Sequence, residues 1–322
     1  MDRIDVGILR WYLQGHLTAP FRAEVRPNVR LLSERMGVTG ETVRNRMRRM
    51  FASGVLTGVV AQPNPGVLGM KAGALGLYLQ HGAARAKVAR SLALVEGMQV
   101  VATHIDGMVG VVFLHEGGTS LERKVNLMKE IAGATESEFT DVPFPQCDVV
   151  LGKPDWGILA ALRPDASQSY GVLGKKTGLS PRTVKRRLDR LVAGRAVFTL
   201  ALHNVRAVHG SLEANVVVRY EAGATRPAVD EAIVKALDDS LVYAGVWSSY
   251  SAYAVSIPNL AAADAIGERV AKIRGVKYAR ASVMEERLEV YDSVDRAIAE
   301  KLGEATPKLR QPAAVAKGRT KR

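Results

Sequence analysis

The sequence predicts an α+β fold in which two winged helix-turn-helix domains are each followed by a ferredoxin-like (βαββαβ) α/β domain. Three observations support this prediction. A basic helical segment occurs twice, 141 residues apart and without a gap; a β-prone run follows each copy; and strands and helices then alternate in the same order in both halves. The expected domains are residues 1–62, 63–145, 150–205 and 206–304, with a basic disordered tail at 305–322.

Two helices are expected ahead of each basic helix. Residues 5–9 and 155–159 share the pattern Asp-x-Gly-Ile-Leu, which predicts the start of a first helix with a capping Asp and an apolar face. The offset there is 150, so the first copy has nine extra residues in its next connection, within 15–27. Second helices are expected at 29–36 and 170–177.

The duplicated basic segments are residues 37–50 and 178–191. Each begins with a glycine turn, and its apolar residues then recur every three or four positions, as in a helix with one buried face. Thr39 is expected to cap the first helix, and Ser180, followed by Pro181 at the first helical position, the second. This pattern is typical of the recognition helix of a helix-turn-helix.

The segments after the basic helices are predicted to form strands. The runs 54–61 and 194–201 are expected to be the wings of the two domains. The first α/β domain is expected to have strands at 72–80, 99–104, 108–115 and 136–142 and helices at 84–94 and 120–131. The second is expected to have strands at 212–220, 241–248, 251–257 and 276–284 and helices at 227–237, 260–273 and 293–302. Three prolines place the junction of the two halves at 143–154.

Composition favours a polyanionic partner. The net charge is +13 and the pI is near 9.9, with six of the positive charges in residues 307–322. Cys147 is the only cysteine, which excludes an intrachain disulfide. No apolar run reaches the roughly 18 residues of a membrane span, and no secretion signal is recognisable, so a cytoplasmic protein without a membrane partner is expected.

The outward faces of the basic helices carry side chains suited to DNA. Arg can make two hydrogen bonds to guanine and Asn to adenine, whereas Thr and Lys commonly contact phosphate. The alternative interpretation is a solvated charged face. The predicted DNA-binding residues are Thr42, Arg44, Asn45, Arg48, Arg49, Arg182, Thr183, Lys185, Arg186 and Arg190. Because Arg186 replaces Asn45 and Asp189 replaces Arg48, the two half-sites are expected to differ.

The basic helix 42–50, the following Gly54-Val55-Leu56-Thr57-Gly58 and the segment Asn64-Pro65-Gly66-Val67-Leu68-Gly69 resemble the Lrp/AsnC (feast/famine) family of prokaryotic transcription regulators. The second half departs from the pattern, since no Pro-x-x-Leu-Gly follows 203–205. The resemblance implies a sequence-specific regulator that binds double-stranded DNA. It also implies a fused pseudo-dimer that forms a homo-oligomer, a dimer of fused pseudo-dimers.

The same resemblance implies a small effector, such as an amino acid, bound at the α/β domains near the turns that join their middle strands. These turns are residues 104–107 and 248–251. The effector residues implied there are Asp106, Gly107, Ser249 and Tyr250. Gly107 is explained equally well by the geometry of a tight turn.

An enzyme of similar shape is the alternative hypothesis. Siroheme decarboxylases of the alternative heme pathway resemble these regulators in both domains but act on a tetrapyrrole, and the basic charge would suit a carboxylate-rich substrate. No pair of histidines has a metal-ligand spacing such as HExxH. His104 and His115 are interpreted as satisfied structural histidines, and Glu285-Glu286 as solvated charge at a strand end.

The aromatic and basic residues also favour a regulator over an enzyme. The cluster of Trp247, Tyr250 and Tyr253 is interpreted as packing rather than a stacking platform. A decarboxylase is expected to have a degraded recognition helix, whereas both helices here are rich in Arg and Lys. The sequence therefore predicts a chain that is not an enzyme and that requires no cofactor or metal.

Overall fold

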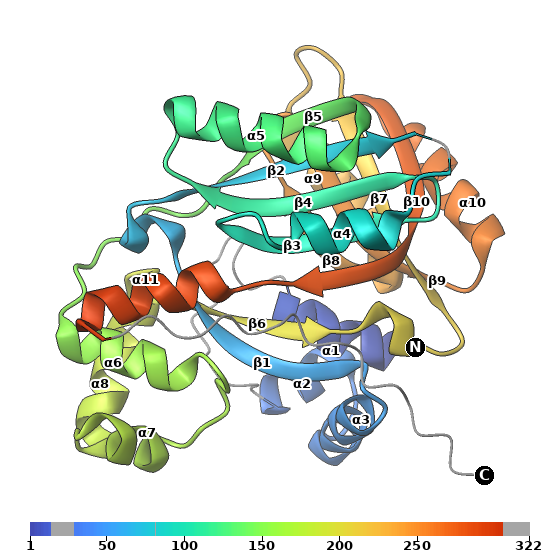
Figure 1. Ribbon diagram of the computed structural model, residues 1–322. Helices are drawn as coiled ribbons and strands as arrows, with labels where there is room; N and C mark the ends of the chain where they lie inside the picture. Colours follow the sequence, from blue (N-terminus) through green and yellow to red (C-terminus); the bar gives the residue numbers. More distant parts are fainter. Residues whose placement is uncertain (14–28, 81, 305–322) are drawn as a thin grey trace, which may run out of the picture.

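Two α/β units lie together on one side of the molecule and two helical units on the other (Figure 1). The structure, a computed structural model, describes residues 1–13, 29–80 and 82–304. The connection expected at 15–27 and the tail expected at 305–322 lie outside these ranges. Among the described residues, no helix combines the length and the apolar character that crossing a membrane requires.

Each helical unit has three helices, as predicted. The first contains α1 (Arg3–Leu13), α2 (Val29–Met36) and α3 (Gly40–Ala52). The second contains α6 (Lys153–Leu162), α7 (Tyr170–Thr177) and α8 (Pro181–Ala193). Thr39 and Ser180 cap α3 and α8, each accepting a hydrogen bond from a backbone N–H three residues later. Val43 and Val184 are fully buried on the inner faces of these helices.

The β-prone runs after α3 and α8 do not form separate wings. They become β1 (Leu56–Pro63) and β6 (Val197–His203), which pair with each other in antiparallel orientation with Val60 opposite Leu200. The prediction of one wing per domain is therefore wrong. A lone strand leaves backbone groups unpaired, and here the equivalent strand of the other half satisfies them. The helical units are thereby joined by a two-stranded ribbon, β1/β6.

The α/β strands form one sheet with the order β5-β2-β4-β3-β10-β7-β9-β8. The first unit contributes β2 (Lys71–Leu79), α4 (Arg85–Leu92), β3 (Met98–His104), β4 (Met108–His115), α5 (Gly118–Ala132) and β5 (Ala134–Val142). The second contributes β7 (Leu212–Tyr220), α9 (Arg226–Leu237), β8 (Leu241–Val246), β9 (Ser251–Ile257), α10 (Leu260–Ala271) and β10 (Val276–Glu289), followed by α11 (Asp292–Leu302). Short 3-10 turns lie at Pro65–Leu68, Val205–Ala207 and Asp238–Ser240. The βαββαβ order is confirmed in both units.

Strand β10 belongs to both units. Its first part, up to Val283, pairs with β7, and the part from Met284 to Glu289 pairs with β3. The predicted strand ended at Met284, so the acidic pair that follows lies inside β10 and not at a strand end. Glu285 accepts a hydrogen bond from Arg85 Nε at 2.9 Å, and Glu286 pairs with an arginine at 3.3 Å. The interpretation of these two carboxylates as solvated charge is therefore wrong.

The helices of the two α/β units cover opposite outer faces. Residues of α4 and α5 pack with the outer face of the first half of the sheet, and residues of α9 and α10 with that of the second half. The inner faces consequently look toward each other, as the layers of Figure 1 show. Helix α1 packs on β8 and α11 packs on α6, so each helical unit is also attached to the second α/β unit.

Candidate nucleic-acid interface and inter-sheet cavity

Helix α3 presents most of its predicted DNA-binding residues to solvent. Arg44, Asn45, Arg48 and Arg49 are exposed, and Thr42 is half-buried near the helix start. Within the helix, Glu41 pairs with Arg44 at 3.3 Å and Arg48 at 3.4 Å, and Arg48 Nη1 donates to Asn45 Oδ1 at 2.8 Å. Exposed pairs of this kind contribute at most about 1 kcal/mol, so the arginines can exchange them for phosphate.

Helix α8 divides its cations between two tasks. Arg182, Lys185 and Arg186 are exposed, and Lys185 pairs with Asp189 at 2.6 Å. Arg190 is exposed as well, but it donates from Nη2 to Asp155 Oδ2 at 2.7 Å. The structure therefore brings Arg182, Lys185 and Arg186 to the outer face, beside the half-buried Thr183, and engages Arg190 in holding α8 on α6.

The buried carboxylate of Asp155 is the anchor of the second helical unit. It is 1% exposed and also accepts from Arg187 Nη1 at 3.0 Å and from the backbone N–H of Gly152 at 2.9 Å. The sequence pattern predicts Asp155 only as the start of a helix and does not by itself identify its two arginine partners. Their spacing on α8 is the signal: positions 187 and 190 lie on the same side of the helix.

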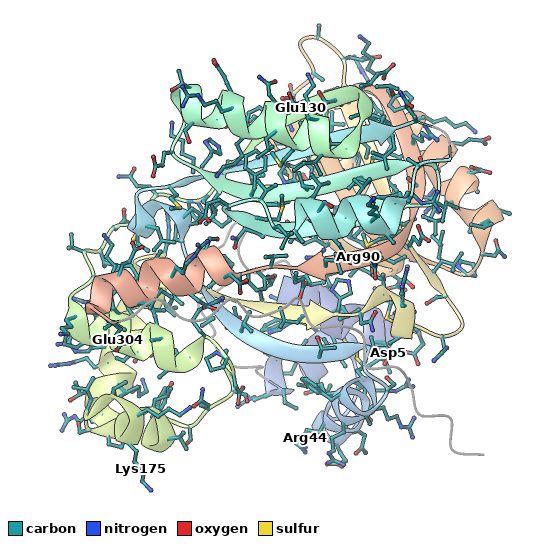
Figure 2. The ribbon with its side chains drawn as sticks, viewed as in Figure 1. Asp5, Arg44, Arg90, Glu130, Lys175 and Glu304 are labelled. Carbon is teal, nitrogen blue, oxygen red and sulfur yellow. The ribbon has the colours of Figure 1, made fainter. Side chains whose placement is uncertain are left out.

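Helices α3 and α8 both lie on the side of the molecule opposite the α/β units (Figure 1). Figure 2 shows Arg44 extending from α3 at the lower edge of the molecule and Lys175 extending from α7 at the same edge. Arg90 and Glu130, in contrast, lie on α4 and α5 of the α/β side. One edge of the molecule thus carries the exposed basic faces of both helical units.

The middle-strand turns of the two α/β units rest on the last strand of the opposite unit. Asp106 Oδ2 lies 3.0 Å from Arg280 of β10, and Gly107 has a φ of 89° in its turn. Ser249 donates from its backbone N to Thr140 Oγ1 of β5 at 2.9 Å. Three of the four predicted effector residues thus take part in turns and inter-unit contacts, and only Tyr250 lines a cavity.

That cavity lies between the inner faces of the two halves of the sheet and above the ribbon β1/β6. It has a volume of about 170 Å³. Gly76 of β2 and Gly110 of β4 are direct cross-strand partners in its wall, and neither has a side chain to fill it. The ribbon supplies Gln62 and Phe198. These four residues were missed, although glycine in the interior of a strand is a recognised sign of open space or close approach.

The predicted aromatic cluster is split between the two faces of the sheet. Trp247 and Tyr250 line the cavity, with their rings edge to face at 5.1 Å between centroids. Tyr253 lies on the outer face, where its hydroxyl donates to Asp230 at 2.6 Å. The packing interpretation therefore holds for Tyr253, while the other two rings border open space.

One end of the cavity carries buried ionisable groups. His203 Nε2 lies 3.1 Å from a carboxylate oxygen of Glu213, and both side chains are buried. Burial raises the pKa of Glu213, but the His203 ring and the Arg287 guanidinium outweigh burial and hold that pKa below its ordinary value. Arg287 Nε in turn donates to Glu289 at 3.1 Å.

The two histidines that flank the β3–β4 hairpin of the first α/β unit, His104 and His115, differ in their hydrogen bonding. His104 Nδ1 lies 3.3 Å from the carbonyl oxygen of Ser282, which confirms it as a satisfied structural histidine. His115 is 3% exposed, and within the described part of the chain its ring nitrogens have no hydrogen-bond partner, so the same prediction is wrong there. Burial lowers the pKa of His115. In the described ranges, no three His, Cys, Asp or Glu side chains gather as a metal site would require.

Comparison with known proteins identifies the second helical unit. Residues 153–192 match the AsnC-type helix-turn-helix domain. An 81-residue stretch is 38% identical to the HTH-type transcriptional regulator Ptr1 of Methanocaldococcus jannaschii, covering 25% of this chain and 49% of that protein. The chain therefore spans about half the length of this curated relative. The resemblance to Lrp/AsnC regulators is confirmed.

Solved structures extend the similarity over the whole chain. The crystal structure of the siroheme decarboxylase NirDL matches with a TM-score of 0.53 and 12% identity, covering 94% of this chain and 99% of that one. Its complex with an iron-uroporphyrin III analogue matches with the same TM-score and coverage at 11% identity. At this identity the similarity establishes the fold alone. The prediction that the chain is not an enzyme is nevertheless overturned, because these two structures, which match over 94% of the chain, are those of an enzyme.

Proposed function

Because the second helical unit is an AsnC-type helix-turn-helix domain, we propose that this chain is a sequence-specific regulator of transcription that binds double-stranded DNA through both α3 and α8. The observation that carries the proposal is the pair of capped helices that lie on the side of the molecule opposite the α/β units and that each carry exposed cations. Neutralising phosphates releases counterions, so such faces favour DNA over less charged partners.

The attachment of the helical units supports a fixed spacing between two half-sites. Arg163, directly after α6, is buried; its Nε donates to Asp295 of α11 at 2.7 Å and its Nη1 to the carbonyl oxygen of Ala61 at 2.9 Å. In the first unit, Arg10 Nε donates to the carbonyl oxygen of Leu241 at 2.6 Å. Helices held in this way meet the duplex at a set separation, which predicts an operator with two unlike half-sites at constant spacing.

Selection of bound DNA from a random pool tests the proposal, followed by affinity measurements over a series of salt concentrations. The variant Arg182→Ala/Arg186→Ala removes two exposed cations of α8. We expect weaker binding and a log-log salt slope reduced by about one unit for each phosphate that the variant no longer neutralises. The matched control is Lys87→Ala/Arg90→Ala, which removes two exposed cations from α4 on the opposite side. Equal effects of the two pairs would reject α8 as a recognition helix.

Self-association, a cytoplasmic location and an effector remain part of this proposal. A homo-oligomer built as a dimer of fused pseudo-dimers would carry four recognition helices and bind extended sites with higher avidity. Light scattering at the concentration used for DNA binding measures its mass directly. A monomeric mass in the presence of a selected operator would contradict this part.

A second candidate is decarboxylation of a carboxylate-rich tetrapyrrole, which the full-length fold similarity to NirDL favours. His203, Glu213 and Arg287 would then be the buried ionisable groups available to a substrate. The cavity of about 170 Å³ is smaller than the roughly 300 Å³ at which pockets for drug-sized ligands begin, so this candidate requires the halves of the sheet to separate. Incubation with siroheme and mass spectrometry of the tetrapyrrole tests it: loss of carboxyl groups supports the enzyme, and unchanged mass rejects it.

A further inference from the structure

We propose that the cavity between the two halves of the sheet binds a neutral molecule of one ring that carries a hydrogen-bond acceptor, and that its occupancy adjusts the two recognition helices. The binding site stands on the geometry of the cavity alone. The regulatory half of the proposal rests on the proposed function.

The size of the ligand follows from the missing side chains in the wall. Gly110 is paired with Gly76 on one side and with Ala102 on the other, so these three neighbouring positions carry no side chain larger than a methyl group. A Cβ atom added at Gly110 would meet no atom within 4 Å. The volume of about 170 Å³ is comparable to the roughly 150 Å³ of an engineered apolar cavity that binds benzene.

The charge of the ligand follows from the pairing of the ionisable groups around it. Arg287 is paired with Glu289, Glu213 with His203, and Glu138 with Arg219 of the neighbouring strand. A carboxylate entering the cavity would lose its hydration and would have to compete for a cation that already has a partner. A neutral ligand avoids this cost.

The polar group of the ligand follows from a buried donor without an acceptor. Within the described part of the chain, Trp247 Nε1 is buried and has no hydrogen-bond partner, and Trp247 lines the cavity. Gln62 also lines the cavity, and its side chain hydrogen-bonds the hydroxyl of Tyr291. Indole can only donate, so a carbonyl oxygen or a ring nitrogen on the ligand would satisfy Trp247, while the rings of Trp247, Tyr250 and Phe198 offer faces and edges to a planar molecule.

The link to the recognition helices is the ribbon. Strand β1 begins at Leu56, just after α3 ends at Ala52, and β6 begins at Val197, just after α8 ends at Ala193. Gln62 and Phe198, which are cross-strand partners in this ribbon, both line the cavity. A ligand that contacts them therefore acts on the strands that position both helices.

Calorimetry on the full chain without DNA tests the site. The probes are benzamide, benzoate, which has the same shape but is charged, and L-phenylalanine, which is zwitterionic. We expect benzamide to bind at least about tenfold more tightly than either, because only it enters without an uncompensated charge. The variant Gly110→Leu fills the cavity and should abolish benzamide binding. The control Gly157→Ala, in α6 and also with open space at Cβ, should leave it unchanged.

The variant Trp247→Phe keeps an aromatic ring but removes the N–H, and it should weaken the binding of benzamide several-fold. If Gly110→Leu does not fold, this variant tests the binding site in its place. Equal affinity for benzamide and benzoate, or benzamide binding that survives Gly110→Leu, would overturn the site. A separate titration of selected DNA with and without benzamide tests regulation. Unchanged DNA affinity at saturation overturns the regulatory half only, and failure to select any DNA motif counts against the proposed function while calorimetry still decides the site.

Discussion

The two helical units use the same kind of basic helix but hold it differently. In the second unit, Arg187 and Arg190 both bind Asp155, which is almost fully buried. In the first, Arg46 reaches Asp2 at 2.7 Å and Asp5 at 3.6 Å, and these carboxylates are 48% and 16% exposed. Arg49 occupies the position that corresponds to Arg190, and both are exposed. A run of arginines on one of these helices therefore contains anchors as well as cations directed to solvent, and a buried carboxylate partner distinguishes the two.

The largest expected effect is on the anchor of the second unit. Asp155→Ala leaves two arginines without their carboxylate and removes the hydrogen bond to Gly152. Because these arginines are partly exposed and can be hydrated, we expect a decrease of about 2 kcal/mol in the free energy of unfolding. Asp5→Ala, at the equivalent position of the first unit, should cost less than about 1 kcal/mol because its pair is weaker and more solvated. Urea unfolding of both variants measures the difference. Equal decreases would show that burial of the pair does not distinguish the units.

A smaller effect is expected on base preference. Arg186→Asn gives α8 the side chain that α3 carries at Asn45, so the half-site read by α8 should change at one position, from a guanine toward an adenine. A good bidentate contact discriminates by about 1 to 3 kcal/mol, and an exposed side chain belongs at the lower end of that range. Repeating the selection with this variant checks the prediction. An unchanged motif would place Arg186 against phosphate instead of a base edge.

The smallest expected effect is on stability at acid pH, and it compares His115 of the first α/β unit with the equivalent residue of the second. His115 pairs with Lys71 across β4 and β2, and its counterpart in the second unit is Ile257, which pairs with Leu212. Burial holds the pKa of His115 below its ordinary value, whereas Asp141 opposes this and Lys124 and Lys71 add to it.

The sign of this pH effect follows from linkage. The unfolded chain binds the proton more readily than the folded one, so stability from this residue is full above the ordinary histidine pKa of about 6.5 and is lost as pH falls below it. His115→Ile should therefore reduce the decline in thermal stability between about pH 7 and pH 5 by less than about 1 kcal/mol. Melting temperatures at the two pH values measure it, with the wild-type chain as reference. An unaltered difference would remove His115 from the acid response.

Local patterns in the sequence predicted the elements well. The middle strands of the two α/β units begin and end within one or two residues of the prediction, because alternating apolar residues bounded by Gly, Pro and Asp depend only on near neighbours. The features that were missed depend on residues far apart in the chain. The pairing of β1 with β6, the extension of β10 beyond Met284 and the contact of Arg190 with Asp155 all require the partner element to be in place.

The candidate site shows the same division. The exposed faces of α3 and α8 follow from helical periodicity, and Thr39 and Ser180 cap them as predicted. The cavity does not follow from periodicity, since its wall is created when Gly76 meets Gly110 across two strands. The family resemblance implies an effector at the turns, whereas the turn residues Asp106 and Ser249 make inter-unit contacts.

Strand β10 continues from one α/β unit into the other, with Val283 opposite Ala214 of β7 and Leu288 opposite Val101 of β3. Cutting the chain between the halves would leave the first half with an unpaired strand edge at β3 and an uncovered inner face, both of which promote aggregation. A dimer of separate subunits can dissociate and combine with other paralogues. Here each half keeps the partner with which it was synthesised, so the two halves cannot exchange partners and the chain always presents the same pair of unlike helices.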